Sequence, residues 1–174
     1  MPLNKYAPQV ATHRRTQSAI LVGAKTLIAT VGLNKMSMIE IADISEVSRA
    51  TLYNHYRDKE SVIAALCESE VERLVTIAQS APTSTDALEL LSLAISQDLA
   101  IAAMRAQDPQ NLTIALSAHD HVLWKAFAVA MSHIVPNHVS CELAIRWLIG
   151  QALYPLTPVQ SRQQAEALTS FANL

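Results

Sequence analysis

The stretch that decides the fold is residues 37–59, which read SMIEIADISEVSRATLYNHYRDK. Ser37 and Glu40 have the spacing of a capping box, in which a serine hydroxyl and a glutamate carboxylate each bond a free backbone N–H at the start of a helix. Ser48 stands in the same position before a second short pattern, so it is a candidate N-cap. The stretch therefore predicts two short helices joined by a three-residue turn, over residues 37–44 and 48–54.

The second of these helices has the composition expected of a helix that touches DNA. A short helix can enter the major groove, about 12 Å wide, while the preceding helix crosses the backbone. We expect Ala50 and Leu52 to anchor the helix inward. The polar side chains then face outward or lie at its edges: Arg49, Thr51, Tyr53, Asn54 and His55.

The rest of the chain predicts further helices and no strand, which makes the fold class all-α. Residues 1–13 lack periodicity and are expected to form a flexible arm. Apolar residues at helical spacing follow up to Gly32, a residue type that commonly ends helices. Asp58 caps a long helix, and SAPTST at 80–85 is a break. The expected helices are 14–31, 37–44, 48–54, 59–79, 86–105, 109–117, 120–134, 138–153 and 159–172, the last preceded by a second capping box at Thr157 and Gln160.

Charge is distributed unevenly along the 174 residues, although the net charge is only −2. Residues 1–59 contain eight basic and four acidic residues, whereas residues 60–174 contain five basic and eleven acidic residues. A basic excess confined to one end is expected if only that end meets phosphates. The sequence shows no apolar run long enough to cross a bilayer and no secretory signal, so a cytoplasmic protein is expected.

Residues 14–66 resemble the DNA-binding domain of the tetracycline-repressor (TetR) family of transcriptional regulators. The resemblance is carried by a first helix ending at Gly32 and by the sequence SMIEIADISEVSRATLYNHYRDKESVIAAL, above all by VSRATLYNHYRDKESV. It covers about a third of the chain. One departure is Glu46, which stands in the turn where the family commonly has glycine. The resemblance implies a helix-turn-helix domain over 14–58 and a helical regulatory and dimerisation domain over 59–174, joined by the long helix.

The resemblance also implies roles for particular residues. Ser48 would cap the recognition helix and bond a phosphate, while Arg49 and Ala50 would contact base edges. Thr51 and Tyr53 would touch phosphate or a thymine methyl, with Asn54 and His55 beside them. Phosphate contacts are implied at Lys59 and at the start of the preceding helix, by Ser37 and Met38.

The C-terminal part is expected to bind a small-molecule effector and a second copy of the chain. An apolar stripe of larger side chains could line the effector cavity or simply be core: Met104, Trp124, Phe127 and Met131. The helix over 138–153 is apolar on more than one face, so one side is expected to meet a partner. The interface is assigned to the last two helices, at Val139, Leu143, Trp147, Leu148, Leu168 and Phe171.

Other readings have less support from the residues. His119, His121, His133 and His138 lack a ligand spacing that favours zinc, so no metal and no cofactor is predicted. Cys67 and Cys141 lie in apolar helical patterns and are expected to be buried thiols. No motif of a catalytic site appears. The expected function is that of a dimeric repressor released from a palindromic operator by a small-molecule ligand. The alternatives to it are a small helical enzyme or protein-interaction module without DNA binding, and a DNA-binding repressor without an effector.

Overall fold

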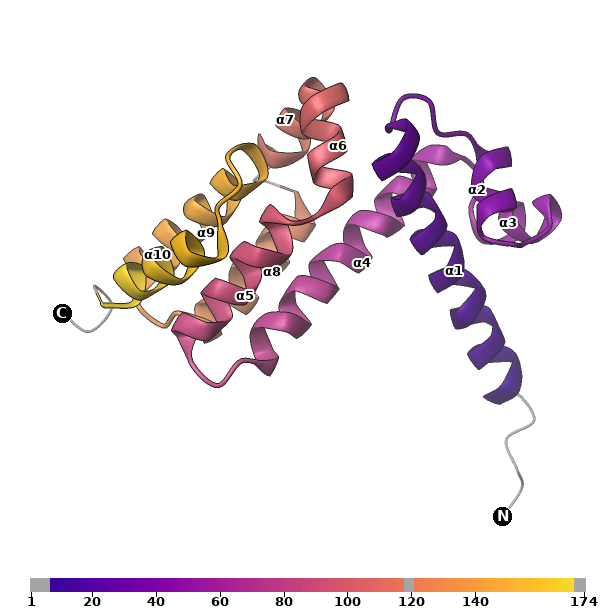
Figure 1. The fold of residues 1–174 in the computed structure, drawn as a ribbon. Coiled ribbons are helices and arrows are strands. Elements are labelled where there is room, and N and C mark those ends of the chain that lie inside the picture. Colours follow the sequence, from indigo (N-terminus) through magenta and orange to yellow (C-terminus); the bar gives the residue numbers. More distant parts are fainter. Residues whose placement is uncertain (1–6, 118–120, 171–174) are drawn as a thin grey trace, which may run out of the picture. The chain divides into compact units, whose positions relative to one another are not determined.

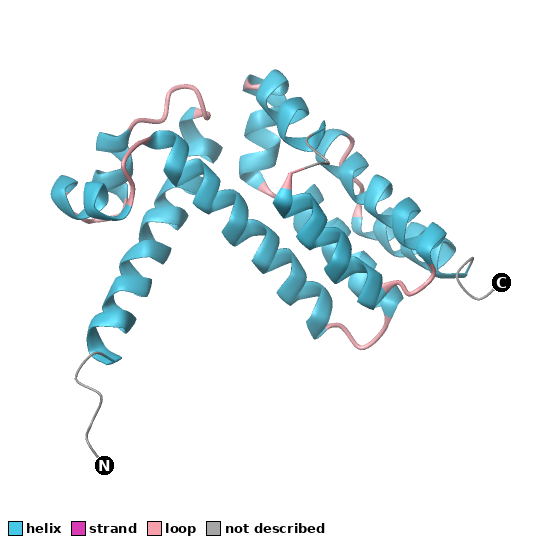
Figure 2. Cartoon of the chain, turned by 180° about the vertical axis from the view of Figure 1, so that it is seen from behind, coloured by secondary structure: helices cyan, strands magenta, loops and turns pink. Residues whose placement is uncertain are grey.

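A computed structural model describes residues 7–117 and 121–170, and these form helices and no strand (Figures 1 and 2). The chain divides into two compact units between Cys67 and Glu68, within α4. The helices are α1 (Ala7–Val31), α2 (Met38–Ile44), α3 (Arg49–His55), α4 (Lys59–Ser80), α5 (Ser84–Ser96), α6 (Leu99–Gln107), α7 (Pro109–Ser117), α8 (Val122–Ile134), α9 (His138–Leu153) and α10 (Pro158–Ser170). The prediction of an all-α chain is confirmed.

Helix α1 begins at Ala7, so the predicted flexible arm is wrong for residues 7–13. Pro8 does not prevent this early start, because the N–H groups of a first helical turn have no partner within the helix and a missing one costs nothing. The remainder of the expected arm, residues 1–6, lies outside the described residues. The consequence is that the basic pair Arg14 and Arg15 stands on a helix rather than on a loose segment.

The first unit is built around a small apolar core from four helices. Ile20 of α1, Ile41 of α2, Leu52 of α3 and Val62 of α4 are all completely buried. Gly23 lies where α1 packs tightly against the end of α2, because a Cβ atom at this position would lie 2.9 Å from Ile44 Cγ2 and would also collide with the Ser45 hydroxyl. Glycine is therefore required here by packing rather than by its backbone freedom.

The helix starts predicted from the decisive stretch are confirmed. Ser37 Oγ accepts a hydrogen bond from the Glu40 backbone N–H at 3.3 Å, and Glu40 Oε2 accepts one from the Ser37 N–H at 3.0 Å. Ser48 Oγ accepts from the Thr51 N–H at 3.0 Å. These bonds satisfy backbone donors that have no partner within the helix, so they fix where α2 and α3 begin.

The helix predicted over residues 86–105 is wrong, because it is two helices. Helix α5 ends at Ser96 and α6 begins at Leu99. Asp98 Oδ1 accepts hydrogen bonds from the backbone N–H groups of Ala100 at 2.9 Å and Ile101 at 3.1 Å. An aspartate placed in this way is a strong N-cap. The break between α5 and α6 was not predicted because the apolar periodicity continues past Asp98.

The core of the second unit lies among α5, α8, α9 and α10, with α5 packed against both α9 and α10 (Figure 1). Its apolar members include Leu88, Leu91, Met131 and Leu148. Small polar residues also enter it: the hydroxyls of Ser92 and Ser161, both fully buried, lie 2.8 Å apart and share a hydrogen bond. A serine pair satisfied in this way avoids the cost of a buried hydroxyl without a partner and lets α5 and α10 approach closely.

The two cysteines differ in their surroundings. Cys141 is buried in the core of the second unit, and this burial raises the pKa of its thiol. Cys67 is exposed on α4, so its predicted burial is wrong. An apolar pattern on a helix is wider than the stripe that is finally covered, and Cys67 falls outside that stripe.

Among the described residues no single helix is both long and apolar enough to span a bilayer; α5 and α6 meet that test only as a pair bent by 50°.

Candidate nucleic-acid interface

Helix α3 presents a polar face held in place by two buried side chains. Leu52 is completely buried and Tyr56 is 8% exposed, so both anchor the helix to its unit. Arg49, Asn54 and Tyr53 are exposed, the tyrosine to 54%. The outward placement predicted for these side chains is therefore confirmed.

Ala50 is exposed, so its predicted role as an inward anchor is wrong. A seven-residue helix has room for one inward stripe, and Leu52 and Tyr56, four residues apart, occupy it. Ala50 instead lies on the exposed side, beside Arg49. A small side chain at such a position allows a close approach to whatever the helix contacts.

Ser48, Thr51, Ser37 and Met38 lie at the starts of the two short helices. The hydroxyls of Ser48 and Thr51 are 2.8 Å apart and hydrogen-bonded, and the Ser37 hydroxyl donates to Glu40 Oε2 at 2.8 Å. Met38 is half-buried. The hydroxyls therefore hold the helix ends together, and the phosphate contacts expected of them remain a prediction.

Lys59 has a structural contact that the sequence pattern did not reveal. Its Nζ donates a hydrogen bond to the Leu33 carbonyl at 2.6 Å and another, at 3.4 Å, to the Asn34 carbonyl. These carbonyls follow the end of α1, where the helix dipole favours a cation. The ammonium group thus ties α4 to the α1–α2 connection, and its phosphate contact stays a prediction.

Glu46 occupies the turn between α2 and α3 with a backbone φ of 55°. This is the left-handed region, which favours glycine because a Cβ atom crowds the backbone there. The resemblance to a family with glycine at this position identified an unusual residue, and the structure gives the physical reason for it. The side chain of Glu46 is exposed.

A pair of histidines at the end of α3 was missed by sequence reasoning. The rings of His13 on α1 and His55 on α3 are stacked, with centroids 4.2 Å apart and planes inclined by 20°. Burial, and then the charge of His13, lower the pKa of His55 below its usual value. The two residues are far apart in the sequence, so no local pattern could have paired them.

In the second unit, the four residues predicted to line an effector cavity do not form one wall. Phe127 and Met131 are buried in the core, 5% and 0% exposed. Trp124 meets Phe127 edge-on at 6.2 Å, and its indole N–H donates to the Ala115 carbonyl at 3.0 Å. Met104 is half-buried. Their predicted role as a cavity lining is not supported by this packing.

An open cavity of about 600 Å³ lies elsewhere in the second unit and contains none of those four residues. It lies where the starts of α5 and α9 meet the end of α10, and it is rich in hydroxyl groups. Its lining is Thr83, Ser84, Thr85, Val135, Pro136, Asn137, Glu166, Thr169 and Ser170.

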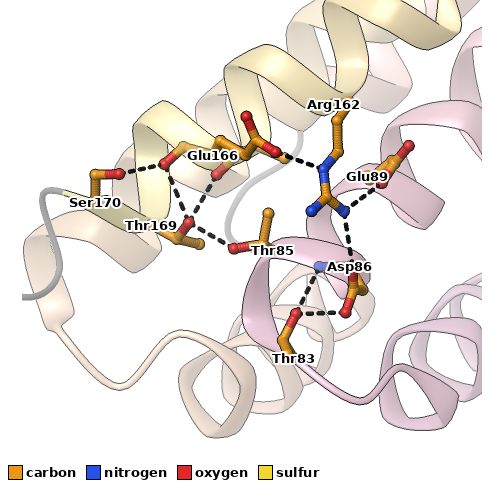
Figure 3. Close-up of polar contacts among 9 residues, drawn as sticks. Thr83, Thr85, Asp86, Glu89, Arg162, Glu166, Thr169 and Ser170 are labelled. Carbon is orange, nitrogen blue, oxygen red and sulfur yellow. Dashed lines mark hydrogen bonds and ion pairs between the residues drawn. The ribbon is translucent and has the colours of Figure 1, made fainter.

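Beside this cavity one arginine gathers three carboxylates (Figure 3). Arg162 Nη1 lies 2.8 Å from Asp86 Oδ1 and 2.9 Å from Glu89 Oε2, both on α5, and Arg162 Nε donates to Glu166 Oε1 at 2.7 Å. Glu89, then Asp86 and Glu166, raise the pKa of Arg162 further above its usual range. A hydrogen bond with Thr83, then Arg162, lowers the pKa of Asp86. The cluster joins α10 to α5.

The five described residues assigned to a dimer interface fall into three groups by exposure. Val139 and Leu143 are exposed on α9, to 65% and 48%. Trp147 and Leu168 are half-buried. Leu148 is only 2% exposed within its own unit, so its assignment to an interface is wrong: the buried stripe of α9 contains it. Phe171 lies outside the described residues.

Among the residues that the structure describes, no group of three histidine, cysteine, aspartate or glutamate side chains could hold a metal ion. His119 lies outside them. His121 caps α8 by accepting from the Leu123 N–H at 3.3 Å, and His138 lies 3.9 Å from Glu142.

Residues 20–66 match the profile of the family described as bacterial regulatory proteins, tetR family. No protein in the curated comparison matches the chain. Many solved structures share the fold at low identity, among them the three that follow. The dihydroxyacetone kinase operon activator DhaS has a TM-score of 0.65 at 13% identity, over 91% of this chain and 96% of that one. GusR of Salmonella enterica has a TM-score of 0.62 at 18% identity, over 91% of this chain and 93% of that one. The TetR family repressor AlkX from Dietzia sp. strain DQ12-45-1b has a TM-score of 0.62 at 16% identity, over 90% of this chain and 95% of that one.

Proposed function

We propose that this chain, whose residues 20–66 match the tetR family of bacterial regulatory proteins, is a dimeric repressor that binds a palindromic DNA operator in the cytoplasm. A small-molecule effector would release it. The proposal rests on the exposed polar face of α3. The side chain of Arg49 is exposed to solvent there, while Leu52 and Tyr56 are buried.

Arg49 is the side chain to which we assign base recognition. An arginine at the start of a recognition helix can donate two hydrogen bonds to guanine O6 and N7, which is worth about 1–3 kcal/mol of discrimination. We assign phosphate contacts to Tyr53, Asn54 and the hydroxyls of Ser48 and Thr51, which lie near Arg49 in the sequence of α3 and its N-cap. In such an interface, phosphate contacts position the helix and base contacts select the sequence. The proposed roles are therefore those of a DNA-binding protein rather than an enzyme.

The test is selection of duplexes from a random-sequence pool by the full chain, followed by fluorescence anisotropy with the selected duplex. We expect enrichment of a palindrome whose half-sites lie about 34–36 Å apart, or a multiple of that spacing. Arg49→Ala should bring the affinity for the selected duplex close to that for scrambled DNA. Lys125→Ala, which removes an exposed cation from the second unit, is the matched control and should change neither value. A pool that remains random after selection would contradict the proposal.

We assign the dimer interface to the exposed side of α9. Val139, Leu143 and Leu153 lie on it, 65%, 48% and 40% exposed. Gly150 falls on the same helix, and a Cβ atom placed there would meet nothing within 4 Å. Glycine lowers helix stability by about 1 kcal/mol relative to alanine, so a glycine with free space around it suits a helix that another helix approaches closely.

We propose that the effector binds in the second unit. The cavity of about 600 Å³ beside α10 is in the size range of ligand sites, about 300–1,000 Å³. Helix α4 contributes residues to both units, which makes it the segment through which binding would be communicated. The effector can shift the protein only by its difference in affinity for the two states.

The packed core around Phe127 and Met131 favours a second candidate, a repressor without a small-molecule effector. A thermal-shift screen separates the two, because a ligand that binds the folded state raises its unfolding temperature. A compound that stabilises the wild type and lowers its DNA affinity would support the effector. A screen without any stabilising compound would favour the second candidate.

A further inference from the structure

The stacked pair His13 and His55 joins the early turns of α1 to the end of α3. His13 is exposed and His55 is half-buried, so solvent reaches the pair. The centroid separation of 4.2 Å places the two imidazoles in direct contact. The pair therefore stands at the edge of the polar face of α3, next to Asn54 and one turn beyond Thr51.

The charged residues that lie next to the pair in the sequence are mostly basic. Arg14 and Arg15 follow His13 on α1 and are exposed. Beyond His55, the side chains of Arg57 and Asp58 bond each other at 3.0 Å, so this carboxylate already has a cationic partner. The ring of His55 also lies near that of Tyr56, with centroids 6.2 Å apart.

Two stacked imidazoles resist becoming doubly charged. The charge that acts on His55 is that of His13, and together with burial it lowers the pKa of His55. Uncharged His55 is therefore the state that the free protein favours near neutral pH. A nearby anion would reverse this preference, because an opposite charge favours the protonated form.

We propose that His13 and His55 form a phosphate-binding element of the DNA interface, and that DNA binding is accompanied by protonation of the pair. This inference rests on the proposed function, since DNA supplies the phosphate. Duplex DNA carries one negative charge for every ~1.7 Å of its axis, so a pair bordering the recognition helix would meet one or more of them. Each phosphate would offset the repulsion between the two protonated imidazole rings.

The direction of the pH dependence follows from this coupling. If binding takes up protons, affinity rises as pH falls, by about tenfold per pH unit for each proton taken up. The increase begins as pH falls through the pKa of DNA-bound His55 and ends below that of free His55. Because free His55 titrates below the usual value of about 6.5, the dependence should extend through the mildly acidic range.

The experiment uses the full chain and a labelled duplex recovered by selection from random sequence, with affinity measured by anisotropy at constant ionic strength across this pH range. Calorimetry in buffers of different ionisation enthalpy counts the protons taken up. His13→Gln and His55→Gln should each remove most of the slope. His13→Lys carries a permanent charge, so it should retain affinity at alkaline pH with a flattened slope. His133→Gln, an exposed histidine of the second unit, should keep the wild-type slope.

A wild type whose affinity is independent of pH and that takes up no protons would overturn the inference while leaving DNA binding intact. So would His13→Gln and His55→Gln variants with the wild-type slope. If no duplex binds at any pH, the proposed function itself fails, and this inference fails with it. Each variant is checked for an unchanged helical circular dichroism spectrum, which separates a lost slope from a lost fold.

Discussion

At the scale of single residues, Glu46 has a backbone conformation that a residue with a side chain rarely adopts. Its φ of 55° lies in the left-handed region, and its side chain is exposed. We expect Glu46→Gly to stabilise the first unit by about 0.5–1 kcal/mol, since the relief of a left-handed Cβ outweighs the added freedom of the unfolded chain. Hydrogen exchange of peptides from α2 and α3 measures this directly.

The matched control is Asp43→Gly, an exposed position inside α2, where glycine should destabilise by about 0.3 kcal/mol. Faster exchange in Glu46→Gly than in the wild type would contradict the prediction.

Lys59 provides a second prediction at this scale. Replacing it by methionine leaves the Leu33 and Asn34 carbonyls without their ammonium partner, and should cost the first unit about 1–2 kcal/mol. Lys35→Met, an exposed lysine close in sequence, is the control and should change stability little. Equal stability of Lys59→Met and the wild type in urea unfolding, followed by circular dichroism, would show that the contact contributes nothing.

At the scale of helices, Asp98 separates α5 from α6. Asp98→Ala removes the acceptor of two backbone N–H groups and the partner that lies 3.7 Å from Arg73, so we expect a loss of about 1–2 kcal/mol. Both tryptophans of the chain lie in the second unit, at positions 124 and 147, so fluorescence during urea unfolding reports on this unit. Asp98→Asn keeps the cap and should recover most of the stability; an equal loss in both variants would assign the effect to the Arg73 contact.

The Arg162 cluster predicts how the contact between α5 and α10 responds to acid. The lowered pKa of Asp86 means that its contribution is present above about pH 4, its ordinary range, and disappears as pH falls through the folded-state value. Arg162→Met should therefore lower the unfolding temperature most at neutral pH, where three carboxylates lose their cation, and progressively less in acid. Lys125→Met is the control. A difference from wild type that stays constant with pH would rule out this electrostatic origin.

The elements that sequence reasoning located share a local cause. The starts of α2, α3 and α10 are each fixed by a side chain bonding a backbone group three residues away, as in the box of Thr157 and Gln160. Two contacts that it missed join residues distant in the sequence: His13 with His55, and Lys59 with Leu33. Leu148 and Leu143 are chemically alike, and only the packing of α9 decides which one is buried.

At the scale of the whole molecule, the proposed dimer depends on the exposed side of α9. Leu143→Glu places a charge in the proposed interface, where its desolvation is costly, and should convert the dimer to a monomer in sedimentation velocity. Affinity for a palindromic duplex should fall accordingly. Ile114→Glu, on a side chain 67% exposed in α7, is the control and should remain dimeric. A Leu143→Glu protein that stays dimeric would place the interface elsewhere.

The unequal cysteines provide a way to follow the molecule in solution. The chain has two thiols, and only that of Cys67 is exposed, on α4 where the two units divide. A maleimide reagent should couple there without any substitution, because the buried Cys141 is inaccessible and reluctant to ionise. A nitroxide attached to each copy would then give one inter-label distance per dimer, and pulsed electron paramagnetic resonance would show whether that distance changes when DNA or a ligand is added.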